Sequence, residues 1–210
     1  MNKANFTLAK TLGAVMLCAG AHAALAETVS VPASVTVNNA IDFTFTGTLD
    51  FGTVRAVADG TDLTCTGLEL PANPTLPITA DIPAACSAGE GDAVIQSVGG
   101  TPARPVFTVA GTAPFTNLTV TVPDTTIPLT AATGPGTPQF FLSEFTVYRT
   151  SGTATTITID ADGEGILQTN ATGEATFTVG ATLATHLGTV ANTNYQDMAY
   201  TGTFDVEVVY

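Results

Sequence analysis

The sequence is poor in the residues that most nucleic-acid, membrane and catalytic sites use. Its 210 residues include no Trp, two His, three Cys, and only five Lys and Arg against 18 Asp and Glu. Both lysines, Lys3 and Lys10, lie near the N-terminus, so residues 27–210 hold three arginines against 18 acidic residues, a net charge near −15. Such a surface repels nucleic acid and anionic lipid, which excludes both as partners.

The first 26 residues have the pattern of a secretory signal peptide. Lys3 and Lys10 are followed by an apolar run, and the small residues 24–26 precede Glu27. This order predicts a signal over residues 1–26, cleavage between Ala26 and Glu27, and export to the periplasm, cell surface or exterior. A lipid anchor at Cys18 is the alternative, but Leu17 is larger than the residue that precedes a lipidated cysteine. No later stretch is long and apolar enough to insert in a membrane.

Two cysteines remain after the signal, Cys65 and Cys86. In an oxidising compartment an even pair predicts one disulfide, which contributes about 3 kcal/mol in the chain-entropy model. The alternative of a reactive thiol or a zinc site lacks the additional Cys or His ligands that zinc needs.

Catalytic chemistry has few candidates. His186 is the single histidine after residue 26, no G-x-S-x-G motif occurs, and no acidic pair stands out among the 18. We expect His186, in "ATHLGT", to be a surface-loop or strand-end residue rather than a base. The sequence therefore predicts a non-catalytic protein without a cofactor.

One acidic stretch is a weak calcium candidate. In "DADGEG", Asp160, Asp162 and Glu164 alternate as Ca²⁺ ligands do, but the remaining ligands of an EF-hand loop are missing. Asp-Gly between two apolar strands is also a strong hairpin signal, and we favour the turn, with which a weak calcium site is compatible.

The rest of the chain predicts an all-β, antiparallel, immunoglobulin-like or pilin-like sandwich over residues 39–210. Thr and Val are abundant, no helical periodicity is present, and turn clusters separate apolar segments every 8–12 residues. Residues 56–104 break this pattern with prolines at 71, 74, 77 and 83 and with both cysteines. We expect an irregular excursion there, held by the disulfide, with a short strand at 93–98. The expected strands after it are 105–111, 116–123, 126–131, 140–149, 155–161, 165–169, 174–183 and 200–210.

Residues 29–51 alternate apolar and polar for too long to be one strand, because a single strand of this length would extend about 80 Å. Asn38 and Asn39 interrupt the apolar face, so we expect the first strand of the sandwich to begin at Ile41. Pro32 lacks an N–H, which suits an edge or inserted strand. Residues 27–38 are thus predicted to be an N-terminal extension, and its apolar face, the candidate donor strand, consists of Val29, Val31, Ala33, Val35 and Val37.

The C-terminal segment alternates in the same way. Its predicted core face consists of Tyr200, Phe204, Val206, Val208 and Tyr210, with Gly202 on the same side.

Several segments together resemble a known family. They are "TLDFGTV" (48–54), "FTVAGTAPFTNLTVTVPDTTIPLT" (107–130), "LSEFTV" (142–147), "GEATFTVGATL" (173–183) and "YTGTFDVEVVY" (200–210). Their order is similar to that in the DUF4402 family of secreted bacterial proteins with a pilin-like β-sandwich, and more weakly to spore-coat-U-type pilins. Residues 56–104 are longer than the corresponding connection of the family.

The resemblance implies a surface or fimbrial structural subunit that self-associates or binds a related subunit, with a periplasmic chaperone as a further expected partner. In such fimbriae an alternating N-terminal extension completes the sandwich of the neighbouring subunit. The alternative is a monomeric secreted adhesion or binding module, in which residues 27–38 fold back on their own sheet and residues 56–104 present the binding surface.

Overall fold

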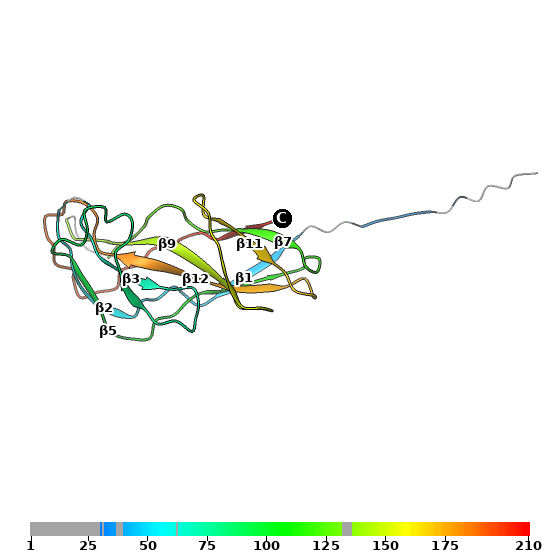
Figure 1. Ribbon diagram of the computed structural model, residues 1–210, viewed down its shortest axis with the longest axis horizontal. Helices are drawn as coiled ribbons and strands as arrows, with labels where there is room; N and C mark the ends of the chain where they lie inside the picture. Colours follow the sequence, from blue (N-terminus) through cyan, green and yellow to red (C-terminus); the bar gives the residue numbers. More distant parts are fainter. Residues whose placement is uncertain (1–29, 31, 37–39, 62, 132–135) are drawn as a thin grey trace, which may run out of the picture. The chain divides into compact units, whose positions relative to one another are not determined.

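The computed structural model describes residues 30, 32–36, 40–61, 63–131 and 136–210. The chain divides into two units, Met1–Val37 and Asn38–Tyr210. The described residues of the first unit have exposed side chains and no regular secondary structure. The described part of the second unit consists of strands and loops without a helix, so no described helix could cross a membrane (Figure 1).

The described part of the second unit contains thirteen strands. They are β1 (Asp42–Thr46), β2 (Thr53–Val57), β3 (Gly67–Leu70), β4 (Thr79–Asp81), β5 (Val94–Gly99), β6 (Val106–Ala110), β7 (Asn117–Thr121), β8 (Ile127–Leu129), β9 (Phe140–Arg149), β10 (Thr155–Ile157), β11 (Glu164–Gln168), β12 (Ala175–Ala184) and β13 (Glu207–Val209). Every strand expected after residue 105 is present, although the last one is much shorter than predicted.

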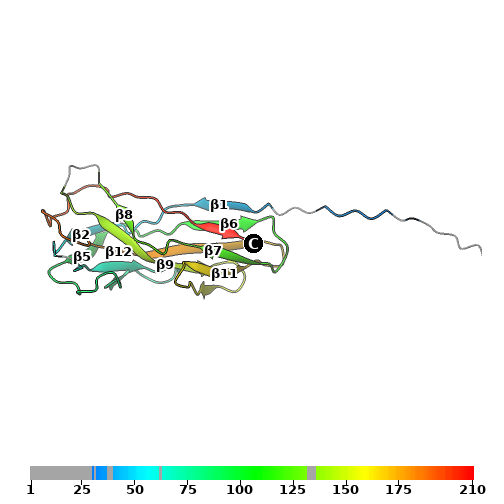
Figure 2. The ribbon, with the colours of Figure 1, turned by 90° about the horizontal axis from the view of Figure 1, so that it is seen from above.

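All the strand pairs are antiparallel. The larger sheet runs β1-β6-β12-β3-β4, with β9 on the other edge of β12 and with β8 and β10 on β9. A second sheet has the order β11-β7-β13, and β2 and β5 form a separate pair. Figure 2 shows β1 and β6 side by side along one edge of the larger sheet. The prediction of an antiparallel all-β sandwich is confirmed.

The core lies between the two main sheets and is organised around β12. Phe177 and Val179 of β12, Leu118 of β7 and Leu167 of β11 are fully buried in a single apolar cluster. β12 pairs with β6 through its first half and with β3 through its last residues, while β9 follows its opposite edge. Along β12 the apolar residues Ala175, Phe177, Val179, Ala181 and Leu183 alternate with threonines and Gly180, yet almost every residue of the strand is buried, because other segments cover both of its faces.

The chain crosses the sheet at Gly180 of β12. A Cβ atom at this position would lie 2.2 Å from the carbonyl oxygen of Leu70 and 2.3 Å from the amide nitrogen of Ala72. Ala72 donates its N–H to Thr146 Oγ1 (3.1 Å), and its carbonyl accepts from Thr178 Oγ1 (2.6 Å). Glycine at this position therefore lets the segment after β3 pass directly over the central strand.

Residues 56–104 are more ordered than the sequence predicted. The strand expected at 93–98 is confirmed as β5, but the segment also contains β3 and β4, and β3 joins the larger sheet beside β12. Leu68 and Leu70 of β3 are buried. The prediction of an irregular excursion was wrong here because a four-residue strand covered on both faces shows no alternation, and neighbouring prolines hid it.

The predicted disulfide between Cys65 and Cys86 is confirmed. Cys65 lies two residues before β3 and Cys86 follows β4, so the bond closes the loop that contains both strands. Both cysteines are buried.

We expect Gly180→Ala to lower the free energy of unfolding by about 1–3 kcal/mol or more, because the new methyl group meets backbone atoms that cannot move aside. Urea denaturation measures this loss. Gly99→Ala is the matched control: Gly99 is also a strand glycine, but a Cβ there would have no atom within 4 Å. Equal losses in the two variants would contradict the close crossing.

Replacing both Cys65 and Cys86 by Ala should cost about 3 kcal/mol, the entropy of the loop that the disulfide closes. Denaturation of the oxidised protein and of the double variant measures the difference. A change below about 1 kcal/mol would show that β3 and β4 hold this loop without the bond.

Candidate functional site: an open side of the sandwich

One edge of the larger sheet contacts one edge of the smaller sheet. On that side, Ile157 and Ile159 fill the space beside Gly165 of β11, so the edge of the larger sheet at β10 meets the edge of the smaller sheet at β11. The opposite edges are β1 and β13, and no described strand pairs with the outer edge of either. We call this the open side. Ile41, Phe43, Phe204 and Val206 pack against the core there, and Phe45 lies opposite Phe107 on the same face of β1 as Phe43.

An aromatic row runs from the core to the open side. The rings of Phe107 and Phe177 stack with centroids 5.1 Å apart, and Phe43 and Phe45 lie 5.7 and 5.9 Å from Phe107. Phe43 and Phe45 alternate along β1, so both face inward. Phe45 nevertheless remains 68% exposed. The row therefore ends in an inward-facing ring that contacts Phe107 but remains largely exposed.

The C-terminal segment forms the other border of the open side. Phe204 and Val206 are half-buried against the core, Val208 is buried, and the ring of Phe204 lies 5.1 Å from that of Phe145. Tyr200 also contacts the core, through Phe140. These four residues have the inward orientation that the sequence predicted.

The prediction for Tyr210 was wrong. Its side chain is 55% exposed, because it follows Val209, whose pairing with Thr119 is the last of the β13 ladder. The predicted strand 200–210 is also reduced to three paired residues. The ladder also ends at Glu207, which pairs with Thr121 of β7. Beyond Thr121, the N–H of Val122 donates to Gly163 O (2.9 Å) and Pro123 has no N–H, so β7 offers no donor to the residues before Glu207.

The predicted extension is only partly described. Ala33 and Val35 are exposed, Val35 by 86%. Val29, Val31 and Val37 lie outside the described residues, as do the predicted signal peptide, its cleavage site between Ala26 and Glu27, and the Asn38-Asn39 break.

A second feature, which sequence reasoning missed, is a cleft of about 830 Å³ that we call the aromatic cleft. The ring of Tyr195 stacks on that of Phe140 at 4.1 Å, and Tyr200 packs edge-on against both. Tyr195 Oη donates to Gln139 O (3.0 Å), and burial raises its pKa. The lining residues are Leu49, Asp50, Phe51, Gly52, Thr53, Val54, Arg55, Ala56, Val98, Leu129, Phe140, Leu183, Tyr195, Gln196, Asp197, Met198, Ala199 and Tyr200.

The only available sequence signal for this cleft was the pair of tyrosines in the polar stretch "NTNYQDMAY". Its other walls come from four separate parts of the chain: residues 49–56, Val98, Leu129 with Phe140, and Leu183.

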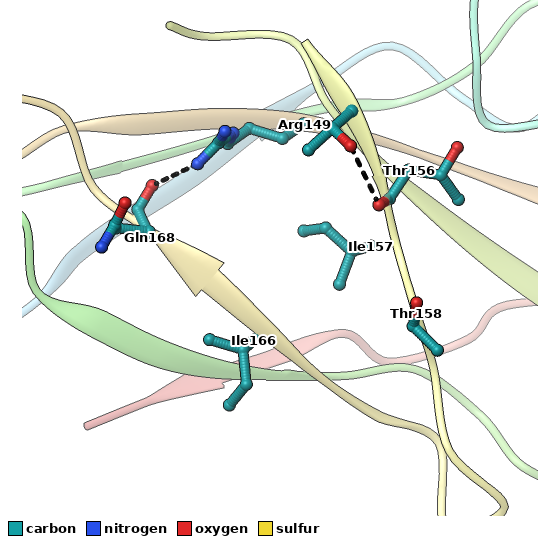
Figure 3. Close-up of a pocket in the computed structure, with 7 residues that line it drawn as sticks. Arg149, Thr156, Ile157, Thr158, Ile166 and Gln168 are labelled. Atoms are coloured by element: carbon teal, nitrogen blue, oxygen red, sulfur yellow. Dashed lines mark hydrogen bonds between the residues drawn. The ribbon is translucent and has the colours of Figure 1, made fainter. Parts of the chain in front are cut away.

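A smaller cavity of about 320 Å³ lies between β10 and β11 (Figure 3). Arg149 closes one end by donating to Gln168 O (3.4 Å) and, more strongly, to Thr153 O (2.8 Å). Ile157 and Ile166 flank the space. Since the guanidinium is already bound to carbonyl groups, the cavity offers no free charged group to a ligand.

The calcium candidate folds as a turn. Asp160 Oδ1 accepts the N–H groups of Asp162 (3.1 Å) and Glu164 (2.9 Å), so its carboxylate stabilises the connection between β10 and β11. Among the described residues, Asp160, Asp162 and Glu164 do not form a group able to hold a metal ion, and no other three acidic, His or Cys residues do. Asn170 binds the N–H groups of Thr172 and Glu174 in the same way before β12.

His186 lies two residues after the end of β12, as the strand-end expectation states, and it is half-buried. Its Nδ1 accepts the N–H of Gln139 (3.1 Å), and its own N–H donates to Tyr195 Oη (2.6 Å). Burial lowers the pKa of the ring. These contacts give His186 the role of joining the end of β12 to the start of β9.

The lowered pKa of His186 predicts a pH effect in a chain that begins at Glu27, where it is the single histidine. Below about pH 6.5 the unfolded chain binds a proton that the folded chain binds less readily, so stability falls as the pH decreases. Melting temperatures at pH 7.5 and 5.5 should therefore differ more in the native chain than in His186→Asn, which keeps an acceptor for Gln139. Equal differences would contradict this effect.

Comparison with known proteins found no relative of this chain. The resemblance to DUF4402 therefore rests on the segments quoted above and stays a prediction. No family model, curated protein or solved structure matches the chain.

Proposed function

We propose that this chain is an exported, non-catalytic structural subunit whose open side accepts one additional β-strand, supplied by residues 27–38 of a neighbouring copy. The observation that carries the proposal is Phe45, an inward-facing ring on the edge strand β1 that is 68% exposed. Core-facing phenylalanines are normally covered, so this exposure indicates a strand position that the described sandwich leaves empty.

The edge of β1 supports the same proposal. An edge strand carries N–H and C=O groups without ladder partners, and an added strand satisfies them while its alternate side chains cover the apolar surface. Val35 is 86% exposed in the described chain, and each buried valine contributes about 1.5 kcal/mol or more. The alternation of residues 29–37 places its apolar side chains on one face, as this contact needs.

The proposed assembly is head-to-tail and open. A copy that gives its extension to one neighbour and receives that of another makes a heterologous contact, which extends into a filament when it does not close into a ring. Before assembly, a periplasmic chaperone that covers the open side would prevent non-productive pairing. The disulfide Cys65–Cys86 suits such an oxidising compartment.

The aromatic cleft favours a second candidate function, a monomeric adhesion or binding module. In that case residues 27–38 pair with their own β1, and the cleft, which includes residues of the 56–104 segment, binds the ligand.

Deleting residues 27–38 from the mature chain should leave a folded monomer that does not polymerise. Size-exclusion chromatography and unboiled gels measure this: ladders in the mature chain should disappear in the truncated one. Polymerisation without residues 27–38 would contradict the proposal. A mature chain that is monomeric and has a protease-resistant N-terminus would instead establish the binding-module alternative.

The apolar register provides a matched control. Val35→Asp should abolish the ladders, because it places a carboxylate among the inserted apolar side chains, whereas Ser34→Asp adds the same charge on the opposite face. Equal loss in both variants would contradict the alternating contact.

A further inference from the structure

A rigid loop presents an aromatic ring to solvent at one end of β12. Phe115, in the loop between β6 and β7, is 63% exposed and has φ +56°, a left-handed conformation that a bulky residue adopts at a cost of about 1–3 kcal/mol. Its N–H donates to Asn170 O (3.1 Å). Thr169 Oγ1 and Thr116 Oγ1 both donate to Ala113 O (3.0 and 2.8 Å). The loop is therefore held in place, although the ring itself is not buried in the sandwich.

The aromatic cleft lies at the other end of the same strand. Phe115 is bonded to Asn170, in the turn that precedes Ala175 at the start of β12, whereas Leu183 in the cleft wall lies near the end of β12. Ten residues of strand separate these ends by roughly 30 Å. Phe115 cannot reach the cleft of its own copy, but a head-to-tail assembly brings opposite ends of successive copies together.

The side chains that line the aromatic cleft can accommodate a phenylalanine ring. The cleft combines polar groups with apolar and aromatic side chains such as Phe51, Phe140 and Tyr195, and a buried phenylalanine contributes about 150–250 Å² of contact surface. Met198 at the cleft is 45% exposed, and methionine adapts to incoming apolar groups.

Charge also favours contact between the Phe115 loop of one copy and the aromatic cleft of another. Two copies with a net charge near −15 repel each other, and the loop at residues 111–116 carries no charged side chain. The guanidinium groups of Arg104 and Arg149 bind backbone carbonyls, but that of Arg55 in the cleft has no hydrogen bond or ion pair with any described residue. Asp42 and Glu174, near the Phe115 loop, are exposed carboxylates that Arg55 of a second copy can meet; Asp50 and Asp197 make the rest of the cleft acidic.

We propose that Phe115 of one copy inserts into the aromatic cleft of the next, forming a second subunit contact beside the added strand. The inference rests on the proposed function for its head-to-tail direction. Residues 40–42, where the described sandwich begins, lie against the Phe115 loop through the Asp42–Ala110 pair and the contact of Gly111 with Ala40. The copy that donates its extension therefore presents Phe115 from the same end.

Cysteine cross-linking of the mature chain tests the contact. Phe115→Cys protein mixed with Met198→Cys protein should form a mixed disulfide dimer at least tenfold faster than Phe115→Cys mixed with Ile166→Cys. Ile166 is the control because it is 61% exposed and lies outside the aromatic cleft. Equal rates for the two mixtures, or a predominance of Phe115→Cys homodimers, would overturn the inference.

Phe115→Ala separates this inference from the proposed function. If both hold, this variant should shorten the ladders and Ile166→Ala should not, while Val35→Asp abolishes them. Ladders that depend on Val35 but not on Phe115 would overturn the cleft contact and leave strand addition intact. The cross-link between positions 115 and 198 could instead form after deletion of residues 27–38, with ladders that Val35→Asp leaves unchanged. That result would overturn strand addition and leave the end-to-end contact.

Discussion

The pairing of β12 on both of its edges is the constraint on which the sandwich depends. β9 follows one edge, while β6 and β3 share the other. β3 can reach its position only because Gly180 leaves room for residues 70–72 to cross the strand. Backbone atoms fill that space, so a side chain at position 180 would block the crossing. The place of β3 in the sheet and the path of the segment 56–104 therefore depend on this glycine.

The closed and open sides of the sandwich follow from this arrangement. Isoleucines beside Gly165 close the side at β10 and β11, and the short ladder of β13 leaves the side at β1 open. The aromatic row from Phe177 to Phe45 ends at that open side, where an inward-facing ring is exposed. An incomplete sandwich edge and an apolar, alternating N-terminal segment are complementary, which is the physical basis of the proposed strand addition.

Much of the fold could be predicted because it depends on local patterns. Alternation located β6, β7, β9 and β11, and Asp-Gly located the turn at 160–164, where the Asp160 carboxylate binds backbone N–H groups instead of a metal. β3 was missed because a short strand covered on both faces has no period. Tyr210 was misplaced because alternation gives the face of a residue but not whether another layer covers it.

The sequence by itself determined the all-β class, most strand positions, the Cys65–Cys86 bond and the inward face of the C-terminal segment. Each of these depends on neighbouring residues or on a pair of cysteines with no other partner. Only the tertiary structure decided which strands form edges, that β3 enters the larger sheet, and that Leu49, Phe140 and Tyr195 meet in one cleft. These features arise from pairing between segments far apart in the chain, and side-chain periodicity carries no information about which distant segment becomes the partner.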